Sequence, residues 1–418
     1  MGMKKSYFYG YIIVSSIFII QMVMVASRVS YGVFIKPLSD EFEWSRALIS
    51  GAFSLSSVIL GFSGILMGLL NDRVGPRVVS TICGILVGSG LMLMYFVHST
   101  WQLYLFYSIL IGLGIGGLIA PQMSTITRWF ITRRNMMLAL LMVGGGLGGI
   151  IGPPLITWFI YTYSWREAFL WVGMAVFILV IIAAQFLKRD PSQIGQTPNQ
   201  KGNETRRKEL ADVEDLSLNQ ALHTQKFWMF SLIMFCFGFC VMTITVHIAP
   251  LAIDRGISAT SAAMILSVIN VAMIAGSLGV GLIADKMGSR RMLIICLCLL
   301  SGVMLFLLPV NSAWVLGIFV VVMNLGGGGI AVLQGTTIAE LFGLKSNGVI
   351  LGCVNFIYTI GASLGAFIAG LVFDSTGNYQ WVFILCGILV ITAIIMSISL
   401  NQIRKTEAMT KSSIQNYK

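Results

Sequence analysis

The sequence is short of charge. Only 10% of its 418 residues are Asp, Glu, Lys or Arg, whereas 57% are hydrophobic. A soluble domain carries about 25% charged residues, so a water-soluble enzyme of this length could not cover its surface. The same composition excludes a disordered or collagen-like chain. What remains is a protein that crosses a membrane several times.

The sequence also lacks the patterns of metal and catalytic chemistry. It has no His-Glu-x-x-His, no Gly-x-Ser-x-Gly and no pair of Asp residues inside an apolar run, so we expect no enzyme. The seven cysteines all lie in apolar runs, and none pairs with His or Asp in a ligand pattern. We interpret them as small core residues and expect neither a metal nor a cofactor.

Long apolar runs fill most of the chain. A helix needs about 20 apolar residues to cross a hydrocarbon core of about 30 Å, and the runs lack the alternation of a β-barrel. We therefore predict an all-α polytopic membrane protein with 12 transmembrane helices. The predicted spans lie near 9–34, 47–70, 78–97, 103–127, 136–160 and 168–187, and then near 227–251, 262–284, 292–309, 314–339, 349–373 and 381–400.

One polar stretch divides six spans from six. Residues 188–225 contain Pro191, Pro198 and mixed charges, which favours a solvated linker over a folded regulatory domain. The predicted domains are a bundle of six helices at 1–187, this linker at 188–225, a second bundle at 226–400 and a tail at 401–418.

The charge distribution predicts the topology. The net charge is +11, which on a soluble protein would suggest a nucleic-acid partner. Here nearly all basic residues fall in loops on one side, and only Lys36, Arg46, Arg166 and Arg255 fall on the other. By the positive-inside rule, both termini and the linker are cytoplasmic in a multi-pass protein of the cell membrane, and we expect no nucleic-acid partner. The first apolar run is long enough to span and has no small-residue cleavage site, so we expect no cleaved signal peptide.

The two halves repeat each other. The segment GLLNDRVGPR at 68–77 recurs 213 residues later as GLIADKMGSR at 281–290, and at the same offset Gly148 and Gly152 meet Gly361 and Gly365. We therefore expect two pseudo-symmetric bundles. An internal duplication of six-span halves is typical of transporters that work by alternating access.

The repeated segment resembles the signature loop of the major facilitator superfamily. The chain also contains YGY at 9–11, YGVF at 31–34, EFEWSR at 41–46, RWF at 128–130 with Arg133 and Arg134, and a segment from His247 to Ser258. In these motifs it resembles one group of the superfamily, the monocarboxylate transporters and oxalate–formate antiporters. The resemblance implies uptake or exchange of small organic anions such as lactate, pyruvate or oxalate, coupled to protons or by anion exchange.

The eighth span departs from that group. The group usually carries an Arg eight residues before the Asp of the repeated loop, where this sequence has Ser277, and an Asp four residues earlier, where it has Met273. The eighth span therefore lacks the charge that other members use to hold the carboxylate, which leaves the substrate and the proton coupling open.

Two titratable side chains fall well inside spans. Arg28 lies in the first span, where burying an Arg costs about 2.5–3.5 kcal/mol, so we expect it to anchor the anion through its guanidinium fork. Tyr31 follows at i+3 and could offer a hydroxyl. His247 in the seventh span could transfer protons. The alternatives are that Arg28 snorkels to the interface and that His247 is hydrogen-bonded to backbone.

Three modes of coupling stay open: proton transfer through His247, movement of the acid with its own proton, and anion exchange. Neutral polar side chains near the middle of spans should face the bundle interior, where they line the cavity or join helices to one another. We expect four of them to contact substrate: Gln122, Asn270, Asn355 and Tyr358.

The repeated loops are predicted to be gates. The resemblance implies that Asp72 stabilises the outward-facing state at the cytoplasmic junction between the halves. Basic residues complete its cluster, and a weaker mirror cluster lies in the second half. The gating residues are Asp72, Arg73, Arg77 and Arg128, mirrored by Asp285, Lys286, Arg290 and Glu340.

Two other functions are alternatives. A glycine-rich run at 144–153 partly resembles the antiporter motif of exporters of hydrophobic or drug-like compounds, but the Arg that they carry in the fourth span falls on Ser108. A non-transporting nutrient sensor often carries a long added domain, whereas this chain has only a short linker and tail. We expect a monomeric protein.

Overall fold

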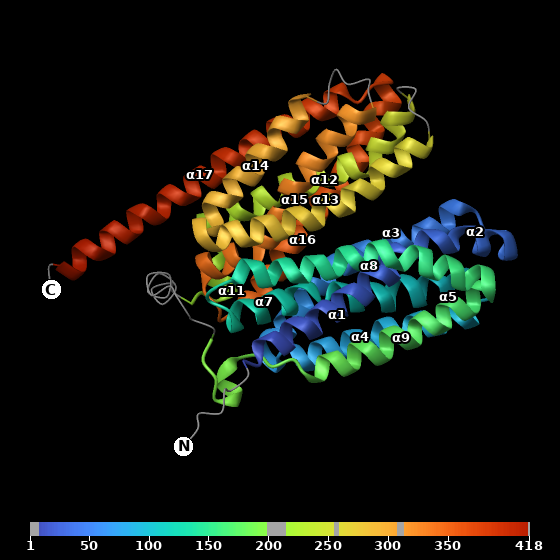
Figure 1. The fold of residues 1–418 in the computed structure, drawn as a ribbon, viewed down its shortest axis with the longest axis horizontal. Coiled ribbons are helices and arrows are strands. Elements are labelled where there is room, and N and C mark those ends of the chain that lie inside the picture. The colour runs from blue at the N-terminus through green and yellow to red at the C-terminus, as the bar shows by residue number, and fades with distance from the viewer. Residues whose placement is uncertain (1–7, 199–214, 255–258, 307–312, 417–418) are drawn as a thin grey trace. The chain divides into compact units, whose positions relative to one another are not determined.

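The computed structural model describes residues 8–198, 215–254, 259–306 and 313–416 (Figure 1). In these ranges the chain is helical and contains no β-strand. The basic residue Arg255, most of the linker and the end of the outer-loop motif lie outside them. The chain divides into two compact units, Met1–Leu216 with Ile338–Cys353, and Ser217–Thr337 with Val354–Lys418.

The first unit contains six apolar helical segments. Its fourth segment is interrupted by a π-helix, η2, and a 3₁₀ turn, η3, follows its last helix. The elements are α1 (Gly10–Val29), α2 (Tyr31–Phe42), α3 (Arg46–Val74), α4 (Pro76–Leu93), η1 (Met94–Phe96), α5 (Thr100–Leu103), η2 (Tyr104–Ile111), α6 (Gly112–Gly116), α7 (Ile119–Trp129), α8 (Arg134–Thr162), α9 (Trp165–Gln185) and η3 (Pro191–Ile194).

The second unit contains the other long helices. Helices α15 and α16 begin or end in the first unit, because the chain passes between the units at residue 338 and again at residue 354. The elements are α11 (Leu218–Leu222), α12 (Gln225–Asp254), α13 (Ala259–Met287), α14 (Ser289–Phe306), α15 (Ala313–Phe342), α16 (Asn347–Thr376) and α17 (Gln380–Asn416).

The predicted spans agree with these helices. Among the described residues, eleven helical segments are long and apolar enough to cross a membrane. The predicted span near 292–309 falls on α14, which continues toward the undescribed residues 307–312. The first segment is longer than predicted, because α2 extends it to Phe42 after a break at Ser30.

Glycines bring the same pair of helices together in each half. In the first unit, a Cβ on Gly148 would overlap the carbonyl oxygen of Met22, so only glycine lets α8 lie this close to α1. In the second unit, a Cβ on Gly361 would overlap the carbonyl oxygen of Phe235 of α12. Both members of the second pair lie 213 residues after those of the first. The internal repeat is therefore visible in helix packing.

Candidate functional site

Arg28 lies in the last turn of α1 and is half-buried. Its Nη2 donates a hydrogen bond to the Ser57 hydroxyl of α3 at 3.2 Å. Its guanidinium carbon lies 5.5 Å from the centre of the Phe53 ring, one turn earlier on α3. A cation over an aromatic face gains about 0.5–1 kcal/mol at an exposed site and more when desolvated. Helix α3 thus contacts the charge with a hydroxyl and an aromatic ring.

Tyr31 supplies a ring beside Arg28, and its hydroxyl is engaged by the backbone. The side chain is 2% exposed, and its hydroxyl donates to the carbonyl of Ile49 at 2.8 Å. The ring stacks on Phe53, with 5.7 Å between centroids, and lies 3.9 Å from the ring of Tyr107. The predicted hydroxyl donor therefore holds α2 against α3.

The π-helix η2 places Tyr107 in this cluster. Side chains one turn apart tie η2 to α3: Tyr104 donates to the carbonyl of Leu48 at 3.0 Å, and Ser108 donates to that of Ala52 at 2.8 Å. Short π segments occur frequently at functional sites, because they shift the face that a helix presents. The apolar sequence gives no sign of this segment.

Gln122 is a fully buried amide on α7. The side chain is 0% exposed, and neither its Oε1 nor its Nε2 has a hydrogen-bond partner among the described residues. Leaving such a group unsatisfied costs about 1–3 kcal/mol. Its amide could therefore hydrogen-bond a polar solute.

His247 of α12 is held through both ring nitrogens. Its Nε2 lies 3.0 Å from the carbonyl oxygen of Ala366, and its Nδ1 lies 3.1 Å from the Tyr379 hydroxyl. A carbonyl oxygen can only accept, so Nε2 carries a proton, and in the neutral ring Nδ1 accepts from Tyr379. Protonation at Nδ1 requires the Tyr379 hydroxyl to turn and accept instead.

The other predicted contacts in the second unit lie on α13 and α16. The Oδ1 of Asn355 accepts from Gln334 Nε2 at 3.0 Å, which joins α16 to α15. The ring of Tyr358 lies 5.7 Å from that of Phe237. Asn270 is half-buried on α13. Their part in binding stays a prediction.

Asp72 binds the N-terminus of α16. It lies in the last turn of α3, not in the loop that the sequence suggested. Its Oδ1 accepts from the backbone N–H of Gly348 at 3.2 Å, and its Oδ2 accepts from that of Val349 at 3.0 Å. A carboxylate at a helix N-terminus satisfies free N–H groups and interacts favourably with the helix dipole. All three residues belong to the first unit.

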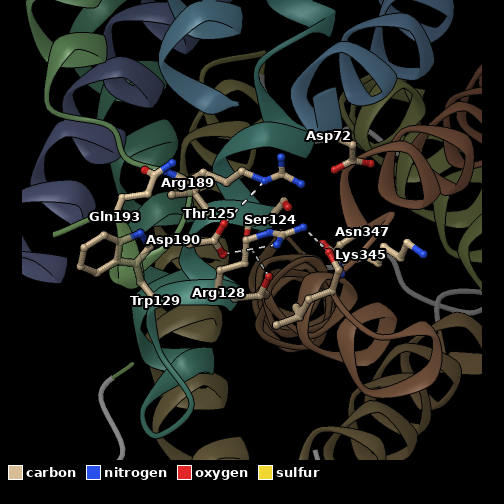
Figure 2. Close-up of polar contacts among 12 residues, drawn as sticks. Asp72, Ser124, Thr125, Arg128, Trp129, Arg189, Asp190, Gln193, Lys345 and Asn347 are labelled. Atoms are coloured by element: carbon tan, nitrogen blue, oxygen red, sulfur yellow. Dashed lines mark hydrogen bonds and ion pairs between the residues drawn. The ribbon is translucent and has the colours of Figure 1, made fainter. Parts of the chain in front are cut away.

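Arg128 lies beside this contact (Figure 2). Its Nη1 lies 3.4 Å from Asp190 Oδ1, and its Nη2 donates to the carbonyl of Leu344. We define the Asp72 cluster as Asp72, Arg128, Arg189 and Asp190.

The other predicted gating residues are divided between the two units. Arg77 donates twice to Gln185 Oε1 of α9, at 2.9 and 2.6 Å, and Arg73 is exposed. In the second unit, Asp285 and Arg290 are half-buried and Lys286 is exposed. Glu340 is half-buried and belongs to the first unit.

Arg134 is a residue that sequence reasoning left without a role. It is 2% exposed at the start of α8. Its Nε donates to the carbonyl of Phe130 at 2.9 Å, and its Nη2 donates to that of Thr127 at 2.8 Å. It therefore caps the C-terminal end of α7, the helix that carries Arg128. The signal in the sequence was a pair of arginines, Arg133 and Arg134, three residues after Phe130 at the end of an apolar run.

The start of the polar linker is attached to the first unit. Trp129 donates through its indole N–H to the carbonyl of Lys188 at 2.8 Å. The Gln196 side chain accepts from the backbone N–H of Tyr9 at 3.1 Å. Asp190, between them, contacts Arg128. The described start of the linker is therefore docked, although its composition suggested only solvation.

Among the described residues, no group of three or more His, Cys, Asp or Glu side chains is placed to hold a metal ion.

The described residues thus combine eleven apolar helical segments of membrane-spanning length, an internal repeat and a helix whose N-terminus is bound by a carboxylate. The sequence model of the Major Facilitator Superfamily matches residues 17–278 and 248–415. The chain belongs to this superfamily, which confirms the predicted fold class.

Sequence relatives narrow the comparison. Monocarboxylate transporter 13 of Rattus norvegicus is 26% identical over 91% of this chain and 86% of its own length. The oxalate:formate antiporter of Oxalobacter formigenes is 25% identical over 87% and 84%. The resemblance to this group, seen in the motifs, is confirmed.

Solved structures agree with the fold. The crystal structure of the superfamily transporter FucP in the outward conformation has a TM-score of 0.71 at 14% identity, and the match covers 94% of this chain and 98% of that one. At this identity the match shows the fold alone.

Proposed function

We propose that this transporter carries small organic anions, of the monocarboxylate or oxalate–formate type, across the cell membrane. The observation that carries the proposal is Arg28: a guanidinium within an apolar span, half-buried, beside a neutral hydroxyl and an aromatic ring. A guanidinium binds carboxylate through two parallel hydrogen bonds. The relatives named for monocarboxylates and for oxalate and formate support this substrate class.

The site is proposed to include Gln122, whose buried amide lacks hydrogen bonds, and, in the second unit, His247, Asn270, Asn355 and Tyr358. Alternating access is proposed to use the contact between Asp72 and the N-terminus of α16 as a lock. Forming and breaking two charge-assisted hydrogen bonds would bias the two states.

Coupling to protons is proposed to depend on His247. The ring is neutral when Nδ1 accepts from Tyr379 and cationic when both nitrogens donate. Anion exchange and movement of the protonated acid are the competing modes.

The test is uptake of radiolabelled lactate and oxalate into proteoliposomes, with and without an inward proton gradient. We expect uptake in the wild type, competition by unlabelled acids, and a loss of about 100-fold or more in Arg28→Gln, since removing one partner of a desolvated charge pair costs about 2–5 kcal/mol. Lys36→Ala is the matched control, because it removes an exposed positive charge on α2. Gradient-driven uptake that loses its pH dependence in His247→Gln supports proton coupling.

Two results would contradict the proposal. If folded protein takes up neither labelled acid, and no unlabelled small acid binds in competition, the substrate is not a small carboxylate. That result would favour an exporter of hydrophobic compounds. Full uptake by Arg28→Gln would remove Arg28 from the site.

A further inference from the structure

The loop between α15 and α16 is hydrogen-bonded through both backbone groups of one residue, Leu344. The backbone N–H of Leu344 donates to Asp215 Oδ1 at 2.7 Å, and the carbonyl of the same residue accepts from Arg128. The N–H of Lys345 also donates to Asp215 Oδ1, at 3.2 Å. Asp215 lies at the end of the polar linker, whereas Arg128 lies on α7. Linker and helix thus hold one peptide segment between them.

The loop is shaped to receive Asp215. Gly343 has a φ of +77°, and a Cβ at this position would overlap the Asp215 carboxylate. Glycine is needed here both for the left-handed backbone and for the close approach. Next to it, the backbone N–H of Leu216 donates to the carbonyl of Phe342, the last residue of α15, at 3.0 Å. The consecutive loop residues Gly343, Leu344 and Lys345 therefore all lie against Asp215 at the end of the linker.

The turn at 343–345 leads directly into α16, the helix that Asp72 binds. Helix α16 begins at Asn347, and its Gly348 and Val349 donate to Asp72. Leu344 and Gly348 are four residues apart, so the position of the first peptide determines where the second N–H points. A carboxylate contact to backbone N–H groups is directional and is lost when the donors turn away.

We propose that Asp215 is a positioning residue of the Asp72 lock: the end of the linker holds the Gly343–Lys345 turn so that the first N–H groups of α16 face Asp72. Arg128 shares the task, because it contacts Leu344 and, through Asp190, the start of the same linker. Both ends of the linker therefore meet at the lock. The linker is then part of the machinery that stabilises one transport state, in addition to connecting the halves.

Hydrogen–deuterium exchange of the purified full-length protein tests this, in nanodiscs and without substrate. In Asp215→Ala, exchange at Leu344 and Lys345 should rise by about tenfold, since each loses a hydrogen bond to a charged group. Exchange at Gly348 and Val349, which Asp215 does not touch, should rise by about threefold or more. Asp72→Ala gives the full effect of releasing α16, and amides of α8 report whether the whole unit has loosened.

Matched variants keep the result interpretable. Asp374→Ala removes an exposed carboxylate from the other end of α16. It should leave the exchange of all four amides, those of the turn and those of the first turn of α16, unchanged. Asp215→Asn keeps an acceptor oxygen without the charge, so smaller increases are expected at the same four amides. This variant carries the test if Asp215→Ala does not fold.

Three outcomes would overturn the proposal. Faster exchange at Leu344 and Lys345 alone would make Asp215 a local cap of the turn. No change at any of the four amides would remove it from the lock. An equal rise in α8 would mean general destabilisation.

Discussion

Two arginines of the first unit lie in helices and are held in different ways. Arg134 is 2% exposed and donates to two backbone carbonyls of the α7 end, at 2.8 and 2.9 Å. Arg28 is half-buried and contacts one hydroxyl and one aromatic ring. Backbone carbonyls cannot leave Arg134 without unwinding the helix, whereas a hydroxyl and a ring are neutral partners that a carboxylate can outcompete. This difference agrees with a structural role for Arg134 and with the binding role that we propose for Arg28.

The largest effect is expected from replacing Arg134, and it concerns the stability of the protein. Arg134→Ala leaves two buried carbonyls unsatisfied and opens a cavity, so we expect a loss of about 3 kcal/mol or more in the free energy of unfolding. Arg134→Lys should recover little, because an ammonium lacks the planar fork that reaches both carbonyls. The apparent melting temperature of detergent-purified protein measures this.

The control for Arg134 is Arg28→Ala. Its melting temperature should fall less than that of Arg134→Ala, because Arg28 is only half-buried and its hydrogen bond to the Ser57 hydroxyl contributes about 1 kcal/mol. Equal losses in the two variants would show that the comparison does not separate structural from binding arginines.

The comparison also shows what sequence can and cannot supply. The spans follow from local hydropathy, so most helices lie where the apolar runs placed them, and Arg28 was recognisable as a charge within one. The partners of Arg134 follow from a turn between α7 and α8, and Asp72 meets Gly348 from 276 residues away. Composition has no information on such contacts, because they depend on how helices pack.

The linker shows the same limit. Asp190 and Asp215 look like any acidic residues of a charge-rich segment, yet both lie against ordered backbone or a cation in the structure. The π-helix at 104–111 could not be predicted either, because an apolar run does not distinguish a π-helix from an α-helix. Hydrogen bonds from Tyr104 and Ser108 to α3 hold it, and these require the tertiary fold.

A second, smaller effect tests how Arg28, the arginine that we propose to bind substrate, recognises a carboxylate. Arg28→Lys keeps the charge and loses the bidentate fork, so we expect uptake of lactate to fall by about tenfold in kcat/KM, less than in Arg28→Gln. Proteoliposome uptake across a range of lactate concentrations measures it. Wild-type uptake in Arg28→Lys would show that charge alone is recognised, and loss as complete as in Arg28→Gln would show that the fork is indispensable.

The smallest effect concerns the Ser57 hydroxyl, which contacts the arginine that we propose to bind substrate. Ser57→Ala removes the acceptor that orients the Arg28 guanidinium, and a net hydrogen bond of about 1 kcal/mol corresponds to a rise of about two- to fivefold in KM. The maximal rate should change little, because the guanidinium itself remains. Ser54→Ala is the matched control: it lies on the same helix, donates to the Ser50 carbonyl and is exposed. An unchanged KM in Ser57→Ala would mean that the aromatic ring of Phe53 suffices to place the charge. An equal rise in Ser54→Ala would trace the effect to α3 as a whole, because losing either hydroxyl would then disturb the helix rather than the orientation of one arginine.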